Sequence, residues 1–343
     1  MNTRISAAKC AHMQALSTEN GIIGAAAMDQ RGSLKKAIGA GKGIAPSEVT
    51  DEMMSEFKLS VSKVLTPHAS AILLDPVWGM PGAAARASNA GLLLSYEVSG
   101  YDNTKPGRFA DLLPDVSARR LGSLGANAVK ILLYYTPFED PKINDAKHAF
   151  IERIGDECAA NDLPFFLEFV GYDPDGGNEK GPEFAKRKPE VVAESMREFS
   201  KDRYGVDVLK VEFPVTMKYA AGSRACNGES VYSKAEALDH FRAAADAAGR
   251  PFIYLSAGVA NDVFTESLDW AAEAGVNFSG VLCGRATWQE AIPIYCAEGV
   301  AALEGWLSEH GVTNIGHINT RLAQNATPWY RFYGADSAEA MVA

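Results

Sequence analysis

The sequence is poor in cysteine and has no long apolar segment. Its five cysteines (Cys10, Cys158, Cys226, Cys283 and Cys296) are scattered and form no CxxC motif. That usage argues against a disulfide framework and fits a reducing compartment. No segment reaches the roughly 18 consecutive apolar residues of a membrane-spanning helix, and the first 21 residues lack the apolar core of a signal peptide. We therefore expect a cytoplasmic protein that does not enter a membrane.

Positive charge is scarce as well. The 343 residues include 33 Lys and Arg against 43 Asp and Glu, a formal net charge of −10. This balance argues against nucleic acid or an anionic membrane surface as a partner. An anionic substrate would need a site that gathers positive groups locally. The hydrophobic content of 47% supports a sizeable core and excludes a disordered chain.

The chain contains eight short apolar runs that recur along its length. They cover residues 21–28, 70–75, 91–97, 127–135, 164–170, 206–214, 251–258 and 278–284. None alternates between apolar and polar residues, as a strand with one wet face would. Continuous apolar runs of this length are typical of parallel strands that are covered on both faces.

Stretches with helical spacing separate these runs. They cover residues 47–66, 107–125, 141–161, 184–203, 233–249 and 261–275. Strand and helix alternate eight times without a break in composition, which predicts an α/β fold: a (β/α)8 TIM barrel formed by one domain over residues 1–343. An open doubly wound sheet is the structural alternative, but no GxGxxG follows the first run. Residues 1–20 and 318–343 are expected to be extensions packed on the outside.

Polar residues enter most of the apolar runs near the same end. In chain order they are Asp29, Gln30, Arg31, Asp75, Glu97, Lys130, Glu168, Lys210, Glu212, Ser256 and Arg285. Catalytic groups of a (β/α)8 barrel lie at the C-terminal ends of its strands, so these side chains are expected to gather at one mouth.

Two lysines and a glutamate in this set indicate amine chemistry. Lys210 and Glu212 interrupt the run "VLKVEFP", Lys130 interrupts "AVKILLYY", and Glu168 lies between them in "FFLEFV". A buried charge is costly unless it is paired, so a structural Lys–Glu pair is one interpretation. The other is catalysis by Lys210, Lys130 and Glu168: desolvation and a neighbouring cation lower the pKa of a lysine, and a carboxylate can move protons.

Two glycine-containing stretches predict an anion site. "SAGVAND" contains Ser256 and Gly258, and "CGRATW" contains Gly284 and Arg285. They follow the seventh and eighth runs, where barrels often bind phosphate through backbone N–H groups. Glycine allows close approach of the backbone, and arginine can hold phosphate through two parallel hydrogen bonds.

Metal ligands are not evident at the predicted mouth. No histidine falls at a strand end, which argues against a histidine-held zinc. Asp75 and Glu97 could hold Mg²⁺, or they could act as caps or salt bridges. We predict no metal and no cofactor.

Six stretches together resemble the tagatose 1,6-bisphosphate aldolase family. They are "AMDQRGSLK", "ANAVKILLYY", "PFFLEFVGYD", "VDVLKVEFPVTMKY", "PFIYLSAGV" and "GVLCGRATW", in register from about residue 15 to about residue 330. The resemblance implies a class I, Schiff-base aldolase on a barrel fold. By position it implies that Lys210 forms the Schiff base and Glu168 is the acid/base. It also places Lys130, Asp29 and Gln30 among the polar site residues, and Ser256 and Arg285 among the contacts to a phosphorylated ketose.

Several alternatives stay open. The family has a carboxylate where this chain has Val77 in "DPVWG", and the loops 171–184 and 220–230 also depart from its pattern. Fructose 1,6-bisphosphate or a sulfosugar phosphate such as sulfofructose 1-phosphate are therefore alternative substrates. A non-catalytic sugar-phosphate-binding regulator and a metal-dependent aldolase or isomerase are further alternatives. A homo-oligomer is compatible with the sequence.

Overall fold

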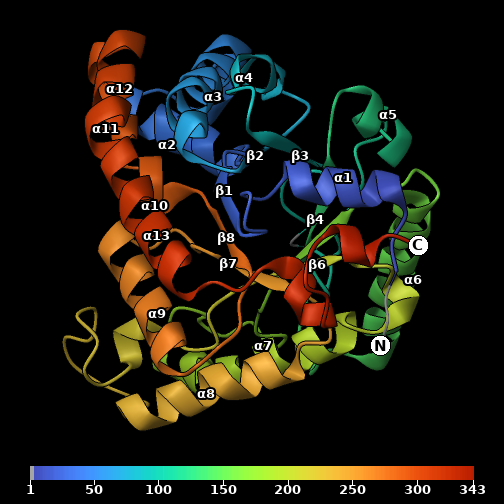
Figure 1. Ribbon diagram of the computed structural model, residues 1–343. Coiled ribbons are helices and arrows are strands. Elements are labelled where there is room, and N and C mark those ends of the chain that lie inside the picture. Colours follow the sequence, from blue (N-terminus) through green and yellow to red (C-terminus); the bar gives the residue numbers. More distant parts are fainter. Residues whose placement is uncertain (1–3, 103) are drawn as a thin grey trace.

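Eight parallel strands close into a barrel (Figure 1). The computed structural model describes residues 4–102 and 104–343; residues 1–3 of the expected N-terminal extension, and Asn103, lie outside the described residues. The strands are β1 (Ile23–Ala27), β2 (Ala71–Leu74), β3 (Gly91–Ser95), β4 (Ala128–Tyr134), β5 (Phe165–Val170), β6 (Val208–Val211), β7 (Phe252–Leu255) and β8 (Gly280–Cys283). They follow one another in chain order, and β8 pairs with β1. The predicted (β/α)8 barrel is confirmed.

Helices surround the barrel. They are α1 (Ala7–Ala15), α2 (Gly32–Lys42), α3 (Asp51–Leu65), α4 (Met80–Ala85), α5 (Ala118–Ser123), α6 (Pro141–Ala159), α7 (Pro182–Phe199), α8 (Lys234–Ala247), α9 (Asn261–Glu273), α10 (Arg285–Trp288), α11 (Ala291–Glu298), α12 (Val300–Trp306) and α13 (Val312–Asn325). Helix α8 begins one residue after the start of the predicted stretch 233–249, because Ser233 is its N-cap and forms a capping box with Glu236. Helix α3 does not begin at Ser47, because the Thr50 hydroxyl accepts the Met53 N–H at 3.2 Å and caps the helix.

The helical stretch expected at 107–125 is mostly a loop. Only its last part forms helix α5. The chain leaves β3 and returns beside itself, so that Glu97 bridges Leu112 and the Leu113 N–H donates to the Tyr96 carbonyl at 3.0 Å. These bonds fix the position of Glu97 at the base of the loop.

The core has two parts. The larger one lies between the barrel and its helices. The smaller one fills the barrel itself with side chains from alternate strand positions: Ile23, Ala25, Ala27, Ala71, Leu73, Leu93, Ala128, Phe166, Val208, Ile253 and Leu282. The barrel is therefore a packed solid and not a channel, and polar groups have room only at its ends.

The two ends of the described chain lie near each other (Figure 1). The Trp329 N–H donates to the carbonyl of Gly21, which precedes β1, so the C-terminal segment lies at the N-terminal ends of the strands. Ile5 forms a parallel bridge with Val342. Met13 of α1, with Trp329 and Met341 of the C-terminal segment, packs against the side chains that fill the barrel. This end is sealed by apolar packing, which leaves the other end for chemistry.

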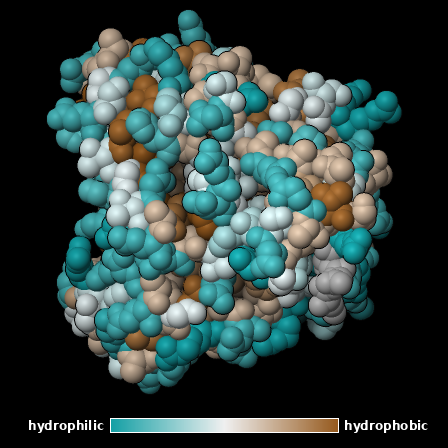
Figure 2. Space-filling view, viewed as in Figure 1, coloured by the Kyte–Doolittle hydropathy of each residue, from teal (hydrophilic) through white to brown (hydrophobic). Residues whose placement is uncertain are grey.

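Hydrophilic residues dominate the face of the molecule shown in Figure 2, and hydrophobic ones form small separate patches. Over the described residues, no helix combines the length and the hydropathy that a membrane crossing requires.

Candidate active site

Lys130, Glu168 and Lys210 form one layer at the barrel mouth. Ala128, Phe166 and Val208 point into the barrel, and the side chains two residues further along each strand share that direction. Those residues are Lys130 on β4, Glu168 on β5 and Lys210 on β6. The sequence prediction that these three side chains meet is confirmed by their distances.

Lys130 lies at the centre of three carboxylates. Its Nζ is 2.8 Å from Asp29 Oδ2, 2.9 Å from Glu97 Oε1 and 2.8 Å from Glu168 Oε2, and its side chain is 1% exposed. Asp29 follows β1 and Glu97 follows β3, so side chains from three other strands converge on this amine. The contacts to Asp29 and Glu97 are hydrogen bonds that the ammonium donates, and the contact to Glu168 is an ion pair.

Lys210 has a different environment. Its Nζ is 2.8 Å from Glu168 Oε2, the same oxygen that contacts Lys130, and its side chain is 5% exposed. The salt bridges of the described residues give it no second carboxylate. The two lysines thus share one acceptor atom, but among the ion pairs of the described residues only Lys130 contacts further carboxylates.

The charge states of the cluster follow from these contacts. Burial is the largest influence on Lys130 and lowers its pKa, but Asp29, Glu168 and Glu97 together outweigh burial and hold the pKa well above its ordinary value. Burial raises the pKa of Glu168 and of Asp29, and Lys130 and Lys210 reverse this, so that both pKa values are lowered. At neutral pH the cluster therefore consists of a cationic Lys130 and anionic Asp29 and Glu168.

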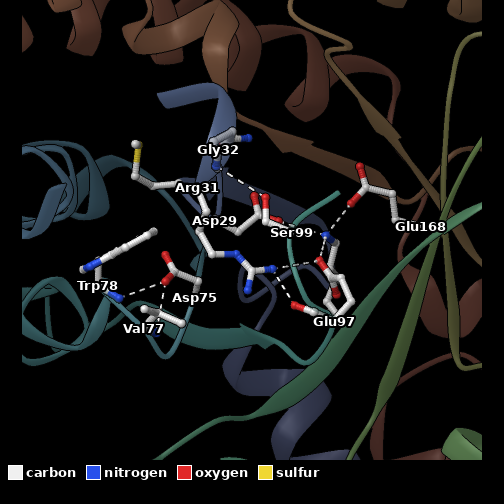
Figure 3. A network of polar contacts seen from close by, with 12 residues as sticks. Asp29, Arg31, Gly32, Asp75, Val77, Trp78, Glu97, Ser99 and Glu168 are labelled. Atoms are coloured by element: carbon white, nitrogen blue, oxygen red, sulfur yellow. Dashed lines mark hydrogen bonds and ion pairs between the residues drawn. The ribbon is translucent and has the colours of Figure 1, made fainter. Parts of the chain in front are cut away.

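Arg31 completes the polar layer on one side. Its Nη2 donates to the Glu97 carbonyl at 2.5 Å and lies 3.7 Å from Glu97 Oε1 (Figure 3). Glu97 therefore has a cation on each side, although the sequence alone left it as a metal ligand, a cap or a salt bridge.

A second buried ion pair lies beneath the first loops. Lys58 of α3 is 2.7 Å from Asp75 Oδ2 and donates to the carbonyls of Met28 and Gln30 at 2.7 and 2.8 Å. Asp75 Oδ1 accepts the N–H groups of Val77 and Trp78 (Figure 3). This pair joins the loops after β1 and β2.

Sequence reasoning did not single out Lys58. A signal was available, because Lys58 follows Met54 by four residues and Phe57 by one, within the apolar face of its helix. Asp75 and Glu97, the expected alternatives for Mg²⁺ ligands, instead face Lys58 and Lys130. Among residues 4–102 and 104–343, no group of three or more His, Cys, Asp or Glu is placed to hold a metal ion.

The predicted anion-site residues come together in two pairs. Gly258 has φ +76°, and a Cβ built there would lie 2.6 Å from Arg285 Cζ, so the guanidinium packs directly on the glycine. A Cβ on Gly284 would lie 3.2 Å from Gln30 Nε2. Ser256 is buried directly after β7. All six predicted substrate-site residues, Asp29 included, thus lie after β7, β8 and β1, which are neighbouring strands.

Glu212 does not join the lysine cluster. Its Oε1 is 3.0 Å from Lys188 Nζ of α7, and its Oε2 accepts the Gly171 N–H at 2.9 Å. It ties the end of β6 to the loop after β5. Lys210 and Glu212 were both expected at the barrel mouth, but these contacts give Glu212 no ion-pair partner in common with Lys210.

The rim contains a fourth buried lysine, Lys147, which, like Lys58, the sequence did not single out. Lys147 of α6 donates to the Tyr134 carbonyl at 2.8 Å and to the Tyr172 hydroxyl at 2.9 Å. Burial lowers its pKa to about 8, Glu139 opposes this and Arg108 adds to it. It joins the ends of β4 and β5.

A barrel that is sealed at one end and gathers buried charged side chains at the other has the layout of a (β/α)8 barrel enzyme, whose active site lies at the C-terminal ends of the strands. The model of the family described as "DeoC/LacD family aldolase" matches residues 23–290. The chain belongs to this aldolase family.

Known relatives agree over nearly the whole chain. It is 51% identical over 326 residues to tagatose 1,6-diphosphate aldolase 2 of Enterococcus faecalis, covering 95% of this chain and 97% of the relative. It is 48% identical over 332 residues to the tagatose 1,6-diphosphate aldolase of Listeria monocytogenes, covering 97% and 96%. The enzyme of Staphylococcus haemolyticus is 48% identical over 94% of this chain and 97% of its own.

Solved structures share the fold. Fructose-bisphosphate aldolase from Plasmodium falciparum superposes with a TM-score of 0.64 at 14% identity, covering 94% of this chain and 98% of that chain. An archaeal fructose-1,6-bisphosphate aldolase with its catalytic Lys covalently bound to a carbinolamine intermediate has a TM-score of 0.51 at 15% identity, covering 87% and 100%. At such identities the likeness shows the barrel fold alone.

Proposed function

We propose that the protein is a class I aldolase that cleaves a ketohexose bisphosphate reversibly to dihydroxyacetone phosphate and glyceraldehyde 3-phosphate through a Schiff base on Lys210. Tagatose 1,6-bisphosphate is the first candidate substrate, because relatives at 48–51% identity carry that name. The observation that carries the proposal is the unequal surroundings of two buried lysines that share one oxygen of Glu168.

The different carboxylate contacts of Lys130 and Lys210 decide which lysine is the nucleophile. An amine must lose its proton before it can attack a carbonyl carbon. Three carboxylates hold Lys130 as a cation, whereas Lys210 contacts one carboxylate oxygen that it shares. Lys210 is therefore the nucleophile, and Lys130 is a fixed positive charge for the substrate oxygens.

The reaction then balances as follows. Neutral Lys210 attacks the C2 ketone, one proton is taken up from solvent, the carbinolamine oxygen leaves as water, and an iminium cation forms; the later hydrolysis returns that proton. The C3–C4 bond breaks, its electron pair moves to the iminium, and the C4 hydroxyl gives its proton to Glu168. Glyceraldehyde 3-phosphate departs, and the enamine takes a proton at C3 and is hydrolysed to dihydroxyacetone phosphate and free Lys210.

Substrate binding uses the remaining predicted residues. Arg285, held against Gly258, is the cation for one phosphate group, with Ser256 and the backbone at Gly284 beside it. Asp29 and Gln30 face the sugar hydroxyls. Fructose 1,6-bisphosphate differs from the tagatose ester at one carbon, and a comparison of kcat/KM for these two esters and sulfofructose 1-phosphate decides the preferred substrate.

The decisive experiment traps the covalent intermediate. The protein is incubated with dihydroxyacetone phosphate, reduced with borohydride and mapped by mass spectrometry, with and without EDTA. We expect an adduct on Lys210 that EDTA does not affect. Lys210→Ala should lose the adduct and lower kcat by roughly three orders of magnitude or more, as removal of a nucleophile does.

Lys188→Ala is the matched control, since Lys188 also pairs with one carboxylate near the mouth. It should keep both the adduct and turnover. An adduct on Lys130 would exchange the lysine roles. A wild-type protein that binds sugar phosphates but forms no adduct would refute the Schiff-base chemistry and favour a regulator or a metal-dependent enzyme.

A further inference from the structure

Glu97 is a buried carboxylate that the proposed chemistry has not used. It is 4% exposed, and its Oε1 is 2.9 Å from Lys130 Nζ. Backbone pairing with Leu112 fixes its position, and Arg31 donates to its carbonyl (Figure 3). A carboxylate this firmly held is expected to have a defined partner.

The charge count around Lys130 changes during the proposed reaction. Before C3–C4 cleavage, Lys130 faces three anions: Asp29, Glu97 and Glu168. When Glu168 accepts the proton of the C4 hydroxyl, it becomes neutral, and the iminium on Lys210 is neutralised at the same moment. Lys130 then keeps only Asp29 and Glu97 as counter-ions.

We propose that Glu97 is a positioning residue for this reaction: it keeps Lys130 protonated and in place while Glu168 carries the substrate proton. The inference rests on the proposed function, because it needs Glu168 to act as the base. Without Glu97, a buried Lys130 beside a neutral Glu168 would depend on Asp29 alone, and it would give up its proton more readily.

All charged neighbours of Lys130 are consistent with this role. Asp29, Glu97 and Glu168 contact it directly. Lys210 acts on it through Glu168, and Arg31 lies on the far side of Glu97. Tyr134, on the same strand, is close enough for Lys130 and Glu168 to influence its hydroxyl. Glu97 and Asp29 each contact one lysine among the ion pairs of the described residues, and Glu97 is the one that is also held by Arg31 on its far side and by backbone pairing with Leu112.

The test is the pH dependence of kcat in Glu97→Gln. This substitution keeps the shape of the side chain and removes its charge. We expect the pH at which kcat falls to half on the alkaline side to move down by about one unit or more, the usual effect of losing one opposite charge. A merely structural role would lower kcat by the same factor at every pH and leave that midpoint unmoved.

Glu212→Gln is the matched control. Glu212 is also buried after a strand and paired with one lysine, but that lysine is Lys188. Its alkaline midpoint should coincide with that of the wild type. If Glu97→Gln does not fold, Glu97→Asp replaces it: the carboxylate is withdrawn by one methylene, and a smaller shift in the same direction is expected.

Borohydride trapping distinguishes a failure of the proposed Schiff-base reaction from a failure of the proposed role of Glu97. A wild type without an adduct on Lys210 refutes the proposed function. A wild type with that adduct, combined with coincident alkaline midpoints in wild type and the Glu97 variant, overturns the role of Glu97 alone. An adduct retained in Glu97→Gln, together with the shifted midpoint, supports it.

Discussion

At the scale of single residues, Lys130 sets the charge of the barrel mouth. Asp29 and Glu168 have lowered pKa values in the folded protein, so their contribution to stability is present above their unfolded pKa values, about 4, and is lost as the pH falls through the lower folded values. Lys130 has a raised pKa, so its contribution is present below its unfolded value, about 10.5, and is lost as the pH rises through the folded value. The cluster therefore stabilises the fold between these limits.

Lys130→Met should destabilise the protein by about 3–5 kcal/mol at neutral pH, because buried carboxylates lose their cation. Burial then raises the pKa of Asp29 above its unfolded value, so the variant should lose stability as the pH rises. Urea unfolding at pH 5 and pH 7.5 should show a larger gap from the wild type at pH 7.5. Lys188→Met is the control. A gap that is equal at both pH values would contradict the assigned charges.

The sequence revealed the members of this site that break a strand pattern. Lys130, Glu168 and Lys210 were predictable because an ionisable group inside a continuous apolar run must be buried, and burial of a charge is costly unless the charge is paired. Glu97 and Lys58 were not assigned, because the partner of a residue at a strand end or within a helix depends on which loop folds over it. The fold of these loops depends on contacts between residues far apart in the sequence, so the sequence pattern did not reveal the partners.

At the scale of secondary structure, the pair Lys58–Asp75 fastens helix α3 to the loop after β2. Lys58 is fully buried and holds two backbone carbonyls as well. The pair gives the loops at β1 and β2 a fixed relation, and Asp29 and Gln30 depend on that relation.

Lys58→Met should destabilise the protein by about 3–5 kcal/mol, since Asp75 becomes an unpaired buried charge. Asp75→Asn alone should also destabilise it. The double variant should be less destabilised than the sum of the two, and denaturant unfolding of all four proteins measures this coupling. Strictly additive losses would show that the two side chains do not interact.

Helices and strands were predictable where the signal lay in residues that are close together in the sequence. All eight strands lie within the predicted apolar runs, and the capping box of α8 marked its first turn. The loop between β3 and α5 was misassigned in part to a helix, because its bridge between Glu97 and Leu112 joins residues 15 positions apart in the chain. The start of α3 was wrong because Ser47 lies in a separate 3-10 turn, Pro46–Glu48, and the Thr50 hydroxyl caps the helix.

At the scale of the whole molecule, the barrel is sealed at one end and reactive at the other. Trp329 is 2% exposed and packs against the side chains inside the barrel, and its indole N–H has no partner among the described residues. The apolar packing at the sealed end therefore stabilises the barrel without contributing a group to the reactive mouth.

Trp329→Ala should cost about 3–5 kcal/mol, as large-to-small core substitutions do. Trp329→Phe should cost less, because it keeps an aromatic ring and removes an unpaired buried donor. Thermal unfolding measures both, and the Lys210 adduct should form normally in each variant that folds. A loss of the adduct in folded Trp329→Phe would show that the two ends are coupled.

The bridge between Ile5 and Val342 brings distant parts of the sequence to strand spacing. The first and last segments of the described chain therefore lie next to each other. A short peptide link between these two segments would leave every strand of the barrel in its present order, so the protein is suited to circular permutation, with new ends opened in an exposed connection away from the mouth.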